Sequence, residues 1–171
     1  EQVARLALEM FDGLGRLGLH DGDPREREWL HAAGILHDVG TLVDYNDHHK
    51  HGHYLVLHAG LAGFLHRELV IIAQLVRGHR KSMQSPGNLS RVLKSGDEDR
   101  ILRLAALLRI AEQLEVGRER AIEGIDCERS GDLVTLHVRA EGDVDVAIWS
   151  AEQEAQVFER ATGHRLAIKS A

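Results

Sequence analysis

Apolar residues recur every three or four positions along most of the first 116 residues, which is the spacing of one face of an α-helix. This pattern predicts helices over residues 2–17, 25–36, 54–57, 65–76 and 97–116. Asp23 and Pro24 suit the cap and the first position of the second helix, because a carboxylate accepts from free backbone N–H groups and proline has none to leave unpaired. The polar stretches 40–52 and 82–96 are predicted to be loops, the second with one helical turn near Leu89.

After Gly117 the apolar period changes from that of a helix to the alternation of a β-strand. Strands are predicted over residues 122–127, 133–139, 144–149 and 165–169, with turn residues between the first three. Ser150 and Gln153 have the spacing of a capping box for a helix that Gly163 would close. We expect residues 126–149 to form antiparallel hairpins on the long helix, and their buried face to comprise Val134, Leu136, Val138, Val144, Val146 and Ile148.

The change of period divides the chain into two parts. We expect a mainly α-helical α+β fold, with a helical domain over residues 1–121 and a small α+β unit over residues 122–171 packed on it. The second part carries no catalytic constellation, so a scaffold or subunit-contact role is expected there. Hydrophobic residues make up 43% of the chain but aromatic ones only 4%, so the core must be aliphatic.

Composition also restricts the setting of the protein. The single cysteine, Cys127, excludes an internal disulfide and a multi-cysteine zinc site, which fits the reducing cytoplasm. No apolar run reaches the roughly 18 residues that a membrane span needs, and no signal peptide opens the sequence. The chain begins at Glu1, inside a predicted helix, which suggests a truncated protein. We expect a cytoplasmic location and no membrane partner.

Charge is unevenly distributed along the chain. The net charge of −6 argues against a general nucleic-acid binder. Residues 48–94 nevertheless carry seven Lys and Arg residues against Glu68 alone, together with seven of the twelve histidines. Such a region favours a polyanion bound at one place, and a solvated basic surface explains it equally well. As phosphate-binding candidates within it we name Lys50, Arg77, Arg80 and Lys81.

His37 and Asp38 stand where the second helix is predicted to end. Neighbouring helix residues point about 100° apart, so the pair can share one ion only where the backbone turns or the carboxylate swings across. An isolated His-Asp pair is more often a buried imidazole with its carboxylate partner. Further imidazoles follow within residues 48–53 and at His79, at the ends of other helical segments, and imidazole and carboxylate together suit Zn, Mn or Fe.

Five short motifs resemble, in order, the C-terminal HD-type domain of the exopolyphosphatase / guanosine pentaphosphate phosphohydrolase family. They are Leu36-His37-Asp38-Val39-Gly40, His48-His49-Lys50-His51, Leu61-Ala62-Gly63-Phe64, Leu75-Val76-Arg77-Gly78-His79-Arg80-Lys81, and Leu107-Leu108-Arg109-Ile110-Ala111-Glu112 continued by Gly124-Ile125-Asp126-Cys127. The resemblance covers nearly the whole chain. It implies an HD-type helical domain that binds a divalent ion (Mg, Mn or Zn).

The resemblance also implies roles for individual residues. His37 and Asp38 would be catalytic and bind metal, with His51 and His79 as further ligands. Glu112 stands where HD proteins have their final Asp, and its longer side chain would change the geometry. The first ligand His of HD proteins has no counterpart before His20, so it either precedes Glu1 or is lacking. His48, His49 and His53 are expected beside the site or at the surface.

Two functions remain open from the sequence. The first is a metal-dependent phosphohydrolase that acts on polyphosphate or a related phosphorylated ligand. The second is a non-catalytic polyanion-binding and dimerisation module, because the resemblance places exopolyphosphatase catalysis in actin-like domains that this chain lacks. No glycine-rich phosphate loop replaces them. The resemblance implies a homodimer in either case, and no specific nucleic-acid partner is expected.

Overall fold

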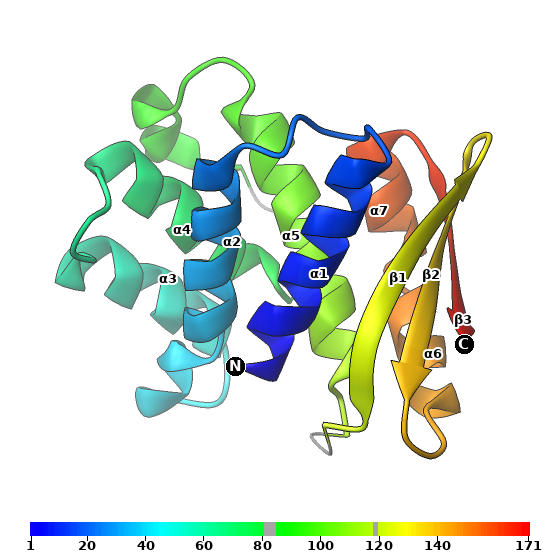
Figure 1. Ribbon diagram of the computed structural model, residues 1–171. Coiled ribbons are helices and arrows are strands. Elements are labelled where there is room, and N and C mark those ends of the chain that lie inside the picture. Colours follow the sequence, from blue (N-terminus) through cyan, green and yellow to red (C-terminus); the bar gives the residue numbers. More distant parts are fainter. Residues whose placement is uncertain (81–84, 118–119) are drawn as a thin grey trace.

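The computed structural model describes residues 1–80, 85–117 and 120–171 and has the expected mainly helical α+β fold. Helices α1 to α5 form one side of the molecule, and a small sheet with α6 and α7 forms the other (Figure 1). The elements in chain order are α1 (Gln2–Arg16), α2 (Pro24–Leu36), η1 (Val39–Leu42), α3 (His48–Ala59), α4 (His66–Gly78), η2 (Gly87–Val92), α5 (Asp97–Leu114), β1 (Ile122–Ser130), β2 (Leu133–Ala140), α6 (Asp145–Glu152), α7 (Ala155–Thr162) and β3 (Arg165–Ser170).

Helix α2 shows how the local sequence sets the position of the His37-Asp38 pair. The Asp23 carboxylate accepts a hydrogen bond from the Arg25 backbone N–H at 2.8 Å, so the helix begins where the sequence predicts. It packs closely on α1, since a Cβ on Gly34 would lie 2.7 Å from the Ala4 Cα. The helix ends with His37 as its C-cap residue, and the pair lies at a helix terminus as predicted.

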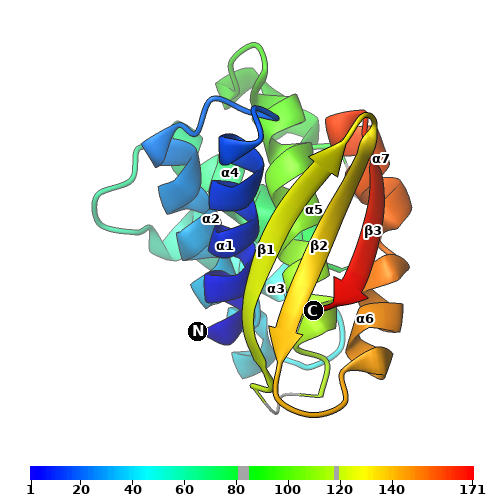
Figure 2. The same cartoon turned by 45° about the vertical axis from the view of Figure 1, so that its right-hand side comes forward.

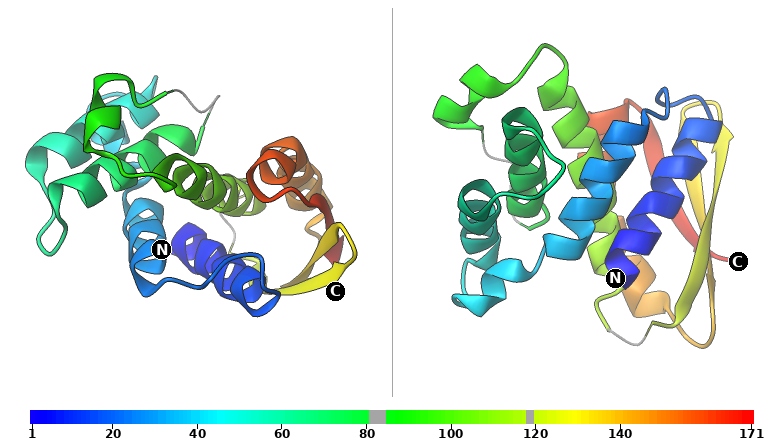
Figure 3. Two further views of the ribbon diagram at one scale, coloured as in Figure 1. Left: turned by 90° about the horizontal axis from the view of Figure 1, so that it is seen from above. Right: turned by 60° about the vertical axis from the view of Figure 1, so that its left-hand side comes forward.

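Helix α5 lies at the centre of the molecule. Its apolar side chains contribute to a core that also contains residues of α1, α4 and the sheet, so the two parts of the chain share one aliphatic interior. Viewed from above in Figure 3, α5 (light green) runs between α1 (blue) and α7 (orange-red). Among its fully buried residues are Leu104, Ala105, Leu107, Leu108 and Ala111.

The sheet has the order β1-β2-β3, with β1 antiparallel and β3 parallel to β2. Figure 2 shows β1 next to α1 and β3 next to α6 and α7. Side chains of α1 occupy the outer edge of β1: Arg5 donates to the carbonyls of Ile122 and Glu123 at 2.7 and 2.8 Å, and Glu9 accepts from the Ile125 N–H at 2.9 Å. These bonds pair backbone groups that an edge strand would otherwise expose.

The prediction of a strand over residues 144–149 is wrong, because Val144 is the N-cap residue of α6 and residues 145–149 lie inside this helix. Val144, Ala147, Ile148 and Ala151 also fit helical spacing, and the helix turns these four inward while Val146 is 73% exposed. Such a short run satisfies both periods. The predicted capping box is absent as well: Ser150 lies inside α6 and donates to Gln113, and α7 begins after Glu154.

The predicted loop over residues 40–52 is also wrong in its second half. Helix α3 begins at His48, so His48 to Gly52 are helical, and Val39–Leu42 is a short 3-10 helix. Glycine makes this packing possible: a Cβ on Gly40 would lie 1.9 Å from the His48 carbonyl oxygen and 2.5 Å from the Gly52 nitrogen. The predicted turn near Leu89 is confirmed as η2. In the described ranges no helix has the length and apolar character to cross a membrane.

Replacement of Gly40 by Ala should destabilise the protein by about 3 kcal/mol, because the added methyl group meets rigid backbone rather than a side chain that can move. Urea unfolding followed by circular dichroism measures the change. Leu42→Ala is the matched control in the same 3-10 helix, and since Leu42 is 83% exposed its effect should stay within about 0.5 kcal/mol. Equal stabilities of the two variants would contradict the close approach.

Asp97 joins the starts of α4 and α5. Its carboxylate is fully buried, accepts from the Lys94 N–H at 2.7 Å and forms a two-point ion pair with Arg67. Burial alone would raise the pKa of Asp97, but the hydrogen bonds from Arg67 and Lys94 outweigh it and lower the pKa. Asp97→Asn should therefore reduce the free energy of unfolding by about 3 kcal/mol at neutral pH.

The loss of stability caused by Asp97→Asn should become smaller as the pH falls. Because the folded pKa of Asp97 is below the unfolded value of about 3.9, its contribution is complete above that pH and disappears as the pH falls through the folded pKa. The stability difference between wild type and Asp97→Asn should shrink on acidification. Asp99→Asn, an exposed change in the same helical turn, should leave the acid limb unaltered, and a pH-independent difference for Asp97→Asn would refute the assignment.

Candidate metal centre

Five polar side chains from four parts of the fold converge on one place. His37 and Asp38 follow α2, His48 begins α3, His79 caps the end of α4, and Glu112 lies in the last turns of α5. His48 and His79 are 3% and 1% exposed, whereas Asp38 and Glu112 retain partial access to solvent. We refer to these five residues as the His/carboxylate cluster.

All three imidazoles of the cluster are oriented in the same way. The Nδ1 atoms of His37, His48 and His79 lie 2.7, 3.0 and 2.6 Å from the backbone carbonyl oxygens of the residues three positions earlier. A carbonyl can only accept, so each Nδ1 carries the proton and donates. In its neutral form each imidazole then directs the lone pair of its Nε2 at the cluster, as in metal-binding histidines whose other nitrogen is held by a carbonyl.

The Nε2 atoms lie very close to one another and to the carboxylates. His48 and His79 bring theirs to 3.2 Å, and the Nε2 of His37 lies 3.1 Å from a Glu112 oxygen. Two nitrogens at this distance need a proton or a metal ion between them, because their lone pairs would otherwise repel. Two nitrogens bound to one zinc at about 2.05 Å in a tetrahedron are about 3.3 Å apart, so the pair has the spacing of metal ligands.

Asp38 faces both halves of the cluster. Its Oδ1 lies 3.5 Å from the Nε2 of His48, and its Oδ2 lies 3.5 Å from the Nε2 of His37. Two sets of possible ligands result, Asp38 with His48 and His79, and Asp38 with His37 and Glu112, and within each set the ligand atoms lie within 4.8 Å of one another. Neutral imidazoles and carboxylates form a donor set that fits a divalent ion.

The pKa values of His37 and His79 are shifted in opposite directions. Burial lowers the pKa of His79 to about 4, assisted by the neighbouring His37, so its imidazole is neutral at physiological pH. Burial also opposes protonation of His37, but the hydrogen bond and charge of Glu112 outweigh it and raise the pKa. Burial would raise the pKa of Glu112 in turn, and its bond to His37 lowers it. The carboxylate is thus kept ionised.

The cluster unites four of the five proposed metal ligands, His37, Asp38, His79 and Glu112. His51 belongs to neither set of ligands among the described residues, whereas His48, which sequence reasoning placed outside the site, belongs to one. The error has a local cause. Residues 48–52 were predicted to be a loop, and only a helix that begins at His48 brings this residue against the end of α4.

The proposed phosphate-binding residues are placed differently from one another. Lys50 is exposed and pairs with Asp47 at 2.8 Å. Burial lowers the pKa of His53 to about 4, and the positive charge of the nearby Arg77 contributes to this shift. Arg80, beside the candidate ligand His79, is half-buried and lines the cavities next to the cluster. Lys81 falls outside the described residues.

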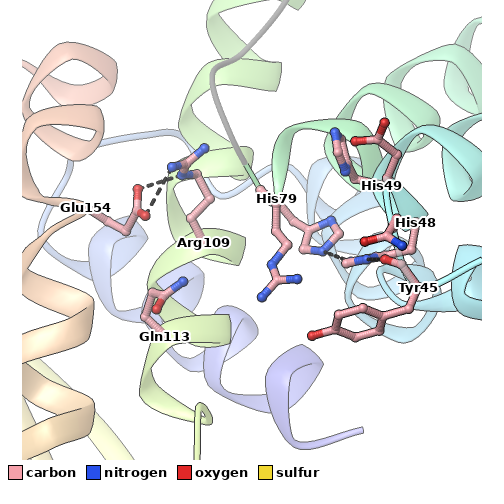
Figure 4. A pocket seen from close by; sticks show the side chains of 10 residues that line it. Tyr45, His48, His49, His79, Arg109, Gln113 and Glu154 are labelled. Carbon is pink, nitrogen blue, oxygen red and sulfur yellow. Dashed lines mark hydrogen bonds and ion pairs between the residues drawn. The ribbon is translucent and has the colours of Figure 1, made fainter.

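Two cavities border the cluster, and each is lined by different members of it. The larger, of about 650 Å³, is lined by His37, Asp38 and Glu112 together with the start of α1. The smaller, of about 310 Å³, is lined by His48 and His79 together with residues of α5 and Glu154 (Figure 4). Tyr45 and Arg80 line both cavities. A ligand in either one would therefore lie beside the cluster and beside a guanidinium.

Comparison with known proteins identifies the family of this chain. The family model described as Ppx/GppA phosphatase, domain III, matches residues 1–162. Proteins named guanosine-5'-triphosphate,3'-diphosphate pyrophosphatase from Vibrio vulnificus, Pseudoalteromonas atlantica and Vibrio campbellii are 27%, 33% and 28% identical over 91%, 64% and 82% of this chain. The matched regions make up 31%, 22% and 27% of those proteins, so the chain spans less than a third of their length. The chain belongs to the Ppx/GppA phosphatase family and corresponds to its domain III.

Proposed function

We propose that this chain is the metal-binding domain of a phosphohydrolase, and that its His/carboxylate cluster holds one or two divalent ions next to a phosphorylated ligand. One observation carries the proposal: three imidazoles are held by backbone carbonyls so that their Nε2 lone pairs converge with two carboxylates. A buried cluster built only for stability would instead alternate donors and acceptors. In two neutral imidazoles the facing nitrogens of His48 and His79 would both be acceptors, since each Nδ1 donates to a carbonyl.

The residues of the cluster would act in different ways. His48, His79 and His37 would bind through Nε2, and Asp38 would use its two oxygens toward the two ligand sets. A divalent ion bound there neutralises charge on phosphate oxygens and makes water more acidic, so that attack on phosphorus becomes easier. Glu112, ionised and 17% exposed in its side chain, lines the larger cavity and would accept a proton from water there.

Arg80 would supply the positive charge that a phosphorylated ligand needs. It lines both cavities and follows His79 directly, so a phosphate at the cluster could receive hydrogen bonds from its guanidinium. The pyrophosphatase names of the relatives agree with a substrate that contains linked phosphates. Polyphosphate or a related phosphorylated compound is the ligand that we propose.

The small fraction of the relatives' length that this chain matches favours a second function. It spans less than a third of their length, so their activity can reside outside the matched region. In that case the domain would bind the phosphate chain, and a second copy of itself, without cleaving any bond. Metal binding and hydrolysis must therefore be measured separately.

The metal proposal predicts a sharp difference between two histidines of the same helix. Purified protein loaded with Mn²⁺ or Zn²⁺ and dialysed should retain at least one ion per chain by mass spectrometry. His48→Ala should weaken binding by at least about 100-fold, since even the partners of metal ligands contribute about 10- to 100-fold. His51→Ala, three residues further along α3 and in neither ligand set, is the matched control and should bind as wild type. Equal retention by both variants would overturn the proposal.

The hydrolase proposal makes a further prediction. Wild-type protein with Mn²⁺ should release phosphate from tripolyphosphate, and Asp38→Asn should lower the rate by at least about 100-fold, because one carboxylate serves both ligand sets. Circular dichroism would verify that the variant keeps its helices, and His51→Ala should remain active. Stoichiometric metal without phosphate release would support the binding-module function instead.

A further inference from the structure

The smaller cavity next to the cluster has a lining rich in cationic and hydrogen-bond-donating groups. The guanidinium groups of Arg80 and Arg109 border it, with the side-chain amides of Asn46 and Gln113. Only two of its described lining residues, Asp47 and Glu154, are acidic, and Asp47 already pairs with Lys50. Figure 4 shows His48 and His79 on one side of this cavity and Arg109 with Glu154 on the other. The lining suits an anion.

Arg109 and Glu154 form a two-point ion pair across the junction between the two parts of the chain. The Nε and Nη2 atoms of Arg109 donate to the two oxygens of Glu154 at 2.6 and 3.0 Å, and Nη1 donates to the Gly78 carbonyl at 3.3 Å. Both side chains are largely buried, at 13% and 12% exposure. The guanidinium on the cavity wall is thus occupied by a carboxylate from the segment that joins α6 and α7.

A carboxylate and a phosphate engage a guanidinium fork with the same paired hydrogen bonds, but the phosphate brings more charge and a third oxygen. A phosphate entering this cavity would meet the guanidinium of Arg80 as well as that of Arg109. Glu154 would then compete with it for Arg109 and repel it through its own charge.

We propose that the smaller cavity is a phosphate subsite formed by Arg80 and Arg109, and that Glu154 acts as a built-in competitor which limits its affinity. The inference rests on the proposed function, since the bound phosphate would belong to the ligand of the cluster. It assigns to the C-terminal unit a regulatory part in binding. Any event that moves Glu154 away from Arg109 would tighten phosphate binding without a change in the cluster itself.

The test uses metal-free protein, so that it does not depend on metal binding or on hydrolysis. Binding of tripolyphosphate is measured by calorimetry at low salt, in the presence of EDTA. Glu154→Gln keeps the length and a hydrogen-bond acceptor but removes the charge, and should tighten binding by about tenfold, which corresponds to about 1.4 kcal/mol. Arg80→Gln should weaken it. Melting temperatures of all variants verify that they are folded.

Glu152→Gln is the matched control, because it removes the same charge from an exposed site two residues earlier. Its affinity should stay within about twofold of wild type. Equal tightening by the two variants, or none by Glu154→Gln, would overturn the subsite. A parallel titration with GTP distinguishes inorganic phosphate chains from nucleotides: tightening with tripolyphosphate, alone or with GTP, supports recognition of phosphate oxygens, and tightening with GTP alone would contradict it.

Loss of metal binding and loss of the subsite are separate results. If Glu154→Gln tightens tripolyphosphate binding while no ion is retained by the wild type, the proposed metal chemistry fails and the subsite stands. If metal is retained but Glu154→Gln has no effect, the subsite is refuted and the metal proposal stands.

Discussion

The geometry of the cluster depends on free backbone carbonyls at helix ends. The last turn of an α-helix leaves carbonyl groups without intrahelical partners. His37 and His79, which cap the ends of α2 and α4, each donate from Nδ1 to such a carbonyl, that of Gly34 or Val76. The two helix ends thus fix the tautomers and the ring directions together. Because two backbone termini supply this orientation, the arrangement needs no additional polar side chains behind the rings.

Helix α5 connects the cluster to the rest of the fold. Its apolar face fills the core, while Arg109, with Glu112 and Gln113 three and four residues after it, lies on the side toward the cavities. Glu112 contacts His37, Arg109 binds Glu154, and Gln113 accepts from Ser150. One rigid helix therefore holds the cluster and the C-terminal unit in fixed relation. The sequence predicted the helix and its apolar face but not these contacts, because periodicity says nothing about which polar groups meet across space.

The predictable parts of the fold are those where one period dominates. Long apolar faces identified α1, α4 and α5, and the His37-Asp38 pair was placed correctly at the end of α2. Short segments with two possible periods were not predictable. Val144 to Trp149 alternates like a strand but also fits a helix, and only its packing on α5 decides. The start of α3 was hidden for another reason: its first turn contains His48 and His49, which are buried through tertiary contacts with α4 and η1 rather than through an apolar pattern.

Glu112 differs from the final Asp of HD proteins by one methylene group, yet it contacts His37 in the cluster. The sequence suggested that a Glu in place of the Asp of HD proteins would change the geometry of the site. In the structure its extra methylene is used to reach from α5 to His37, and the contact of 3.1 Å is the shortest that His37 makes with a carboxylate, since Asp38 lies at 3.5 Å. Glu112 therefore lies among the candidate ligands with its longer side chain. Whether a carboxylate reaches a shared point depends on where its helix runs, so residue type alone is a poor guide to ligand capacity when the packing of that helix is unknown.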